Sequence, residues 1–148
     1  VENKVVIPYV SMYESTTMLV DRLNKKLTEA GIEVKLFDLV HCDEGELSME
    51  LVDCATVVLG SSMVLAGPHP AAVTAAYLVN ALRPKLRYYS IIGSYGWGGN
   101  LEGTIEKMFT IIKPEKLDYV IVKGQPRDED FAKIDVLANQ IIEKHKSL

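Results

Sequence analysis

Short, continuous apolar runs alternate with amphipathic segments along this chain, and the alternation restricts the fold more than any other feature. The runs KVVIPYV at residues 4–10 and TVVLG at residues 56–60 are the clearest. Apolar runs of about four to eight residues are typical of strands buried on both faces, as in a parallel sheet. Pro8 weakens the first strand slightly, because proline cannot donate a hydrogen bond to a neighbouring strand.

The segments between the runs have helical periodicity. Leu19, Leu23 and Leu27 recur at four-residue spacing within residues 15–30, and Gly31 is placed to end that helix. The same reasoning predicts further strands at 32–38, 87–92 and 117–122, and further helices at 44–54, 70–82, 101–112 and 128–144. Five strands alternating with five helices predict an α/β sandwich with a mostly parallel sheet.

Composition narrows the class of protein. The 148 residues are enough for one domain with a sizeable core, and neither a repeat nor a linker divides residues 1–148. A net charge of -4 gives no broad basic field for nucleic acid. No apolar run reaches the roughly 18 residues that a membrane helix needs, and the first residues lack a signal-peptide pattern. We therefore predict a cytoplasmic protein that binds neither nucleic acid nor membranes.

Cysteine and histidine give no sign of a metal site. Cys42 and Cys54 have no CxxC context, fit a reducing compartment, and are expected to be small buried apolar residues. The three histidines are scattered without metal-ligand spacing. His69 is expected to be a surface or helix-start residue rather than a proton donor. The sequence therefore predicts no metal ligands and no catalytic acid or base.

Hydroxyl residues gather between the first strand and the first helix. The segment Ser11–Thr17 contains four serines and threonines, and it is neither a Walker motif nor GxGxxG. The first turn of a helix has free N–H groups at the positive end of its dipole, so it attracts phosphate. One such hydroxyl would indicate only a helix cap. With four hydroxyl residues, an anion-binding site and a simple helix cap are equally open interpretations of this segment.

Two further loops are expected after the third and fourth strands. In residues 60–70, the apolar Met63, Val64 and Leu65 either cover a ligand ring or pack on a neighbouring loop. Residues 92–100 hold four glycines and the only tryptophan, Trp97. Glycines allow backbone N–H groups to approach a ligand closely, and aromatic faces suit a planar ring such as a flavin. The alternative is a tight turn around a core tryptophan.

These loops resemble those of a known family. Residues 11–16 (SMYEST) look like the phosphate loop of flavodoxins. Residues 60–70 and the segment GSYGWGG at 93–99 resemble the flavodoxin domain of flavo-diiron proteins, also called A-type flavoproteins. The resemblance spans essentially the whole chain. It implies a flavodoxin-like three-layer α/β sandwich, with a five-stranded parallel sheet of order 2-1-3-4-5 and helices on both faces, that binds FMN noncovalently.

The resemblance also implies which residues bind the cofactor, with Trp97 as the expected stacking partner of the flavin ring. The implied residues are Ser11, Met12, Tyr13, Glu14, Ser15 and Thr16 at the phosphate; Ser62, Met63, Val64, Leu65, Ala66 and Gly67 at one ring edge; and Ser94, Tyr95, Gly96, Trp97, Gly98 and Gly99 along the ring. Glu14 stands where the family usually has glycine. Met63 and Ala66 stand where it often has threonine and asparagine.

The implied function is electron transfer from FMN to a redox partner protein or a di-iron domain. In the family that domain reduces oxygen or nitric oxide, but this chain lacks its HxExD-type motif. The family usually forms head-to-tail dimers that place FMN beside the partner's iron site. Without the iron domain that dimer has no support here, and a homo-oligomer is left open. A flavin-dependent NAD(P)H or quinone reductase and a cofactor-free interaction module remain alternatives. A phosphoreceiver is excluded, because Tyr9-Val10-Ser11 and Gly60-Ser61 replace its acidic residues.

Overall fold

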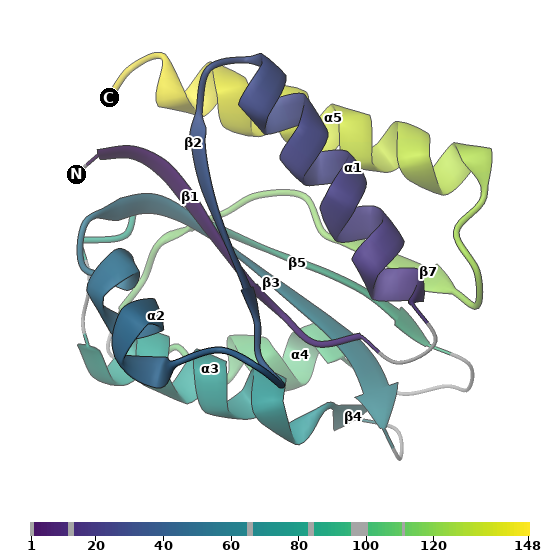
Figure 1. Cartoon of the computed structure of the whole chain (residues 1–148), viewed down its shortest axis with the longest axis horizontal. Helices are drawn as coiled ribbons and strands as arrows, with labels where there is room; N and C mark the ends of the chain where they lie inside the picture. Colours follow the sequence, from purple (N-terminus) through teal and green to yellow (C-terminus); the bar gives the residue numbers. More distant parts are fainter. Residues whose placement is uncertain (1, 12–13, 65–66, 83–84, 96–100, 111) are drawn as a thin grey trace.

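The computed structural model describes residues 2–11, 14–64, 67–82, 85–95, 101–110 and 112–148. They form a central sheet with helices on both faces, and β1 begins on the same side of the molecule where α5 ends (Figure 1). The strands are β1 (Glu2–Tyr9), β2 (Glu33–Asp38), β3 (Cys54–Val64), β4 (Gly67–Pro68), β5 (Tyr88–Tyr95), β6 (Glu115–Lys116) and β7 (Val120–Lys123). The helices are α1 (Ser15–Glu29), α2 (Glu44–Leu51), α3 (Pro70–Leu82), α4 (Leu101–Glu106) and α5 (Asp128–His145).

The order of the strands confirms the predicted topology. β2, β1, β3 and β5 lie side by side in parallel, and both β6 and β7 pair with β5 on its other edge. The fifth position of the order 2-1-3-4-5 is therefore shared by two short strands in succession. Because the main strands are parallel, their carboxyl ends gather at one edge of the sheet.

Alternate residues of the central strands face two hydrophobic layers. Val5 and Ile7 of β1 pack with α1 and α5, whereas Val6 packs with α2 and α3. In β3, Val58 faces α1 and α5, and Leu59 faces α3 and α4. Figure 1 shows α1 and α5 on one face of the sheet and α2, α3 and α4 on the other. Burial on both faces explains why these strands are apolar at consecutive positions.

The helices α1 and α3 agree with their predicted bounds. After α1, Gly31 has a φ of 84°, and the N–H of Ile32 donates to the carbonyl of Leu27 at 3.1 Å. This left-handed glycine is the expected helix end. The prediction for 44–54 is too long, because α2 stops at Leu51 and Cys54 already begins β3.

The loops predicted at 60–70 and 92–100 begin later than the sequence indicates, which corrects both predictions. β3 and β5 continue in register beyond their apolar runs, and Ser62 lies opposite Ser94. Serine and glycine have low strand propensity, so the local sequence gives no signal for this extension. The backbone pairing between the two strands overrides it.

The helix predicted at 101–112 is also too long. α4 ends at Glu106, and side-chain bonds from a neighbouring helix hold the chain that follows. Asn80 of α3 donates from Nδ2 to Thr110 Oγ1 at 3.2 Å and accepts at Oδ1 from the N–H of Ile112 at 3.4 Å. This tertiary contact offers the backbone a partner outside the helix.

The prediction of one continuous strand at 117–122 is wrong in its bounds. β5 pairs first with β6 and then with β7. From Tyr89 to Ile92 β5 advances by three residues, whereas the paired chain advances by four, from Lys116 to Val120. One extra residue therefore bulges from this edge of the sheet. Within the bulge, the carbonyl of Asp118 accepts from Ser90 Oγ and its N–H donates to Gln140 Oε1 at 3.0 Å.

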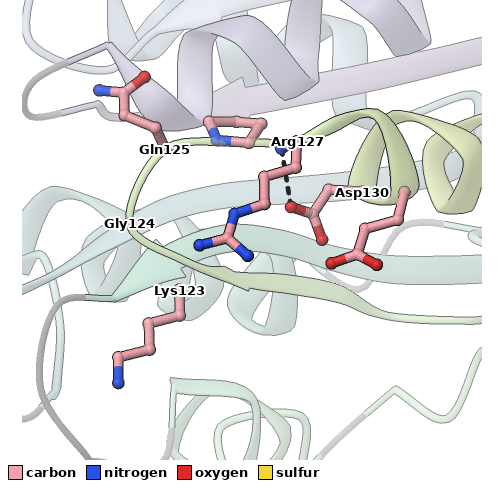
Figure 2. A pocket seen from close by; sticks show the side chains of 7 residues that line it. Lys123, Gly124, Gln125, Arg127 and Asp130 are labelled. Atoms are coloured by element: carbon pink, nitrogen blue, oxygen red, sulfur yellow. Dashed lines mark hydrogen bonds between the residues drawn. The ribbon is translucent and has the colours of Figure 1, made fainter.

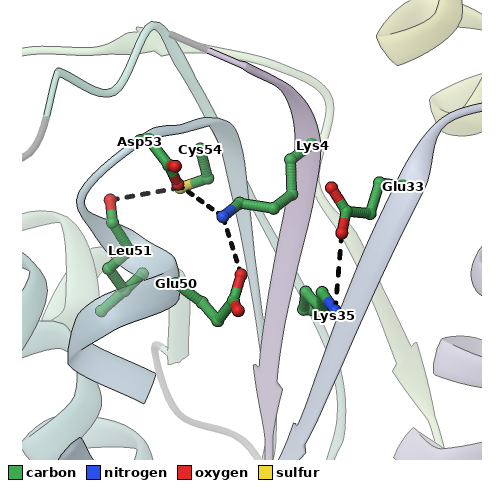
Figure 3. A network of polar contacts seen from close by, with 7 residues as sticks. All are labelled: Lys4, Glu33, Lys35, Glu50, Leu51, Asp53 and Cys54. Carbon is green, nitrogen blue, oxygen red and sulfur yellow. Dashed lines mark hydrogen bonds and ion pairs between the residues drawn. The ribbon is translucent and has the colours of Figure 1, made fainter. Parts of the chain in front are cut away.

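A lysine is buried near the start of β1. Lys4 is 4% exposed, and its Nζ donates to Glu50 Oε2 at 2.7 Å and to Asp53 Oδ1 at 2.5 Å (Figure 3). Burial alone would lower the pKa of Lys4, but the two carboxylates raise it above its usual value. Burial raises the pKa of the neighbouring Cys54 thiol to about 12. Cys54 is thus the expected buried cysteine, whereas Cys42 is only partly buried.

A histidine joins α5 to the first residues of β1 and β3, on the opposite face of the sheet from the Lys4 network. His145, at the end of α5, is 6% exposed. Its Nε2 lies 2.6 Å from Thr56 Oγ1 and its Nδ1 lies 2.7 Å from Asn3 Oδ1. A neutral ring satisfies both contacts if Nδ1 donates to Asn3 and Nε2 accepts from Thr56. Burial lowers the pKa of His145 below the ordinary 6.5.

We expect His145 to make folding stability depend on pH. Its folded-state pKa lies below that of the unfolded chain, so its contribution is complete above pH 6.5 and is lost as the pH falls through that value. Between pH 7.5 and 5.5 this loss is at most about 1.4 kcal/mol. Denaturant unfolding of the wild type and His145→Gln at both pH values measures it. An equal loss in both proteins would contradict the assignment.

Candidate functional site

The carboxyl ends of the main strands form the edge at which α1 and α5 begin (Figure 1). The chain after β1 is fastened to β3, since the N–H of Val10 donates to the carbonyl of Gly60 at 3.0 Å. The turn after β7 is fastened to β5, since the N–H of Gly124 donates to the carbonyl of Tyr95 at 2.8 Å. In open α/β sheets, ligands bind beyond this edge.

The start of α1 combines hydroxyl groups with the free N–H groups of a helix terminus. Ser15 and Thr16 are both buried in the first turn. Ser11 precedes the helix, and its Oγ accepts from the N–H of Thr17 at 3.2 Å. Hydroxyl and N–H donors at the positive end of a helix dipole suit a phosphate-type anion.

Glu14 has a left-handed backbone immediately before α1, with a φ of 62°. Its side chain is exposed and makes no capping hydrogen bond, while its carbonyl accepts from the N–H of Met18 at 3.0 Å. Glycine adopts this backbone conformation at the least cost. Glu14 therefore has a backbone conformation suited to glycine, and its carboxylate is added beside the candidate anion site.

Three buried hydroxyls from three elements meet behind the first turn of α1. Thr16 Oγ1 lies 3.4 Å from Ser62 Oγ of β3 and 3.3 Å from Ser94 Oγ of β5. The three residues are 0%, 4% and 7% exposed, respectively. Each of the three segments that the sequence predicts to meet contributes one of these residues, but Ser62 and Ser94 belong to β3 and β5 and not to loops. Their hydroxyl cluster is a contact that the sequence did not predict.

Gly60 allows α1 to lie close to the sheet. A Cβ at this position would lie 2.8 Å from Tyr9 Cβ and 3.3 Å from Thr16 Cγ2. Real Cβ atoms do not approach another carbon as closely as the first of these distances. The absence of a side chain at Gly60 therefore sets the position of the first turn of α1 against β1 and β3.

The other predicted site residues lie at strand ends or outside the described ranges. Met63 and Val64 are in β3, opposite Pro68 and Gly67 of β4 in a short antiparallel hairpin. The prediction of a loop at Met63 and Val64 is therefore wrong. Tyr95 is the last residue of β5 and is partly buried. The predicted site residues that lie outside the described ranges are Met12, Tyr13, Leu65, Ala66, Gly96, Trp97, Gly98 and Gly99.

His69 connects the hairpin to α3. Its N–H donates to the carbonyl of Ser62 and to Ser61 Oγ, both at 3.1 Å. Its Nδ1 accepts from the N–H of Ala71 at 3.0 Å, which caps the first turn of the helix. The predicted helix-start role of His69 is confirmed.

A hollow of about 560 Å³ lies beyond the end of β7, at the same edge of the sheet (Figure 2). Its lining includes the cations Lys123 and Arg127 and the carboxylates Glu129 and Asp130. The N–H of Arg127 donates to Asp130 Oδ2 at 2.9 Å, at the start of α5. No motif in the sequence singled out these residues, although the end of the fifth strand had to reach this edge of the sheet.

The donor set fits an anion better than a metal. Within the described ranges, no group of three or more His, Cys, Asp and Glu side chains is placed to hold a metal ion. In the same part of the chain, no helix is long and apolar enough to cross a bilayer. The hydroxyls and N–H groups at the start of α1 are neutral donors, which fit the phosphate end of a nucleotide cofactor.

The chain is similar to part of several longer redox proteins. No family model matches the chain. A protein named nitric oxide reductase from Moorella thermoacetica is 30% identical over 143 residues, which cover 93% of this chain and 35% of that protein. A rubredoxin-oxygen oxidoreductase from Megalodesulfovibrio gigas is 28% identical over 140 residues, covering 94% of this chain and 35% of the relative. The chain thus spans about a third of the length of these curated relatives.

The solved structure of rubredoxin oxygen:oxidoreductase from Desulfovibrio gigas superposes with a TM-score of 0.91 at 27% identity, covering 99% of this chain and 37% of that one. The chain is homologous to the flavodoxin-like portion of flavo-diiron proteins and has its fold. A flavodoxin from the domain Archaea matches with a TM-score of 0.81 at 21% identity, over 97% of this chain and 99% of that one. Because the superposition covers 99% of the archaeal flavodoxin, the fold of this chain corresponds to a whole flavodoxin fold.

Proposed function

We propose that this flavodoxin-like domain binds FMN and transfers electrons. The observation that carries the proposal is the hydroxyl-rich first turn of α1, at the edge where β1, β3 and β5 end. Homology to the flavodoxin-like portion of flavo-diiron proteins supports FMN as the ligand of that turn. Bound FMN would supply the redox chemistry, while the protein binds it, orients it and tunes its potential.

The residues of the chain would divide the binding between the phosphate and the ring. Ser11, Ser15 and Thr16 would donate to the phosphate, beside the N–H groups of the first turn of α1. Trp97 is proposed as the stacking partner of the ring, because a large aromatic face binds a planar conjugated ring well. The residues proposed along the ring are Ser62, Met63, Val64, Leu65, Ala66, Gly67, Ser94, Tyr95, Gly96, Gly98 and Gly99.

The proposed electron acceptor is a redox partner protein or a di-iron domain. Two relatives are named for nitric oxide reduction and for oxygen reduction with rubredoxin, and both are about three times longer than this chain. The terminal chemistry is therefore expected from protein outside the described domain. A cytoplasmic location is part of the same proposal.

An FMN titration of the flavin-free protein tests the proposal. We expect quenched flavin fluorescence with a submicromolar Kd, and we expect Trp97→Ala to abolish binding in that range. Absence of binding at tens of micromolar FMN would reject the proposal in favour of a cofactor-free interaction module. Steady oxidation of NAD(P)H by the flavin-loaded domain alone would favour a reductase.

Glu14 provides a sharper form of this test. Removing a carboxylate beside a phosphate is worth about 1 kcal/mol in water, or roughly fivefold in Kd. Glu14→Gln should therefore tighten FMN binding by about that factor at low salt, and the gain should shrink at high salt. Glu14→Gly should give the same gain and also raise stability by about 1 kcal/mol, because it relieves the left-handed backbone. Riboflavin, which lacks the phosphate, should not distinguish wild type from Glu14→Gln.

A further inference from the structure

We propose that the Thr16 hydroxyl is a positioning group that holds the ends of β3 and β5 relative to the start of α1. The inference rests on the proposed function, because those strand ends lead into the segments proposed to contact the ring. It assigns Thr16 a second role, distinct from donating to a phosphate. Through that role, loss of a hydroxyl on α1 would affect binding at the ring end of the ligand.

The geometry of the hydroxyl cluster supports this role. Thr16 Oγ1 lies between Ser62 Oγ at 3.4 Å and Ser94 Oγ at 3.3 Å. Ser62 and Ser94 are themselves opposite one another in the register of β3 and β5. A single side chain of α1 therefore touches both strands at the last positions where they pair with each other.

The hydrogen-bonding capacity of a hydroxyl adds a constraint. Thr16 has one proton to donate and two lone pairs to accept with, so it cannot donate to both serines. At least one serine must donate to Thr16 if both contacts are made. When both donate, the Thr16 proton is not used within the cluster.

The strand ends are themselves connected to other elements. The carbonyl of Ser62 accepts from Ser61 Oγ at 2.7 Å and from the N–H of His69 at 3.1 Å. Because His69 also caps α3, a displacement of Ser62 would also displace the start of that helix. The distances within the cluster exceed the roughly 2.7–2.8 Å typical of hydroxyl pairs, so each contact by itself adds little to the stability of the fold.

The test compares Thr16→Val with Thr16→Ser. Valine keeps the shape that packs on Gly60 but removes the hydroxyl, and serine keeps the hydroxyl. We expect Thr16→Val to raise the Kd for riboflavin, which has no phosphate, by about threefold or more. Thr16→Ser should restore wild-type affinity, and Thr17→Val, at the adjacent position outside the cluster, should leave it unchanged. Ser94→Ala should mimic Thr16→Val and add little to it.

A second readout needs no flavin. Trp97 is the only tryptophan and follows Ser94 by three residues, so we expect Thr16→Val to change its quenching by acrylamide in the flavin-free protein. Weaker FMN binding with unchanged riboflavin affinity and unchanged quenching would overturn the inference and leave Thr16 as a phosphate donor only. If wild type binds neither flavin, the proposed function fails, and the quenching comparison still decides the positioning role.

Discussion

Replacing Lys4 by alanine is expected to lower the free energy of unfolding by about 3 kcal/mol, near the low end for breaking a buried ion pair. Lys4 is the buried member of its network, whereas the side chains of Glu50 and Asp53 are 30% and 43% exposed. Both carboxylates can turn to water once the lysine is gone, which keeps the loss from being larger. Chemical denaturation at pH 7 measures it.

Two matched variants separate charge from packing in this prediction. Lys4→Met keeps the apolar stem without the ammonium group, so its cost should be about 1 kcal/mol, since apolar replacements of buried ions are often tolerated. The double variant Glu50→Gln with Asp53→Asn leaves the buried Lys4 ammonium group without an anionic partner. Its loss of unfolding free energy should exceed the sum of the losses in the two single variants. Equal stability of wild type and Lys4→Ala would show that the network contributes nothing.

Gly60→Ala is expected to destabilise the fold by about 2 kcal/mol and to weaken FMN binding by about tenfold. The new methyl group would overlap Tyr9 Cβ, which belongs to β1 and cannot swing aside, and it would press on the methyl group of Thr16. Relief of the overlap requires α1 or β1 to shift away from β3. That shift displaces the hydroxyls at the start of α1.

The control for this prediction is a glycine far from the site. Gly31 has a φ of 84°, and nothing lies within 4 Å of the position where its Cβ would be. Gly31→Ala should therefore cost about 1 kcal/mol through backbone strain alone and leave the Kd for FMN unchanged. An identical affinity in wild type and Gly60→Ala would contradict the role given to the close contact between α1 and β3.

Much of the candidate site follows from local sequence. Ser15 and Thr16 begin α1 as predicted, and Glu14 has a left-handed backbone at the position where the resemblance to flavodoxins implies glycine. Helix starts and left-handed turns depend on a few neighbouring residues, so the local sequence is enough to predict them. The flavin-ring segments at 65–66 and 96–100 lie outside the described residues, and their role remains a prediction.

The sequence by itself determined the class of fold, because strands buried on both faces must be apolar at consecutive positions and helices must repeat every three or four. It also determined the hydroxyl-rich turn at the start of α1. Only the tertiary structure decided how far β3 and β5 extend, since partner strands set that length through backbone bonds. It also decided that Thr16, Ser62 and Ser94 meet, and that Lys4 is buried between two carboxylates. These contacts join residues more than forty positions apart, and no local pattern records which distant side chain will face another.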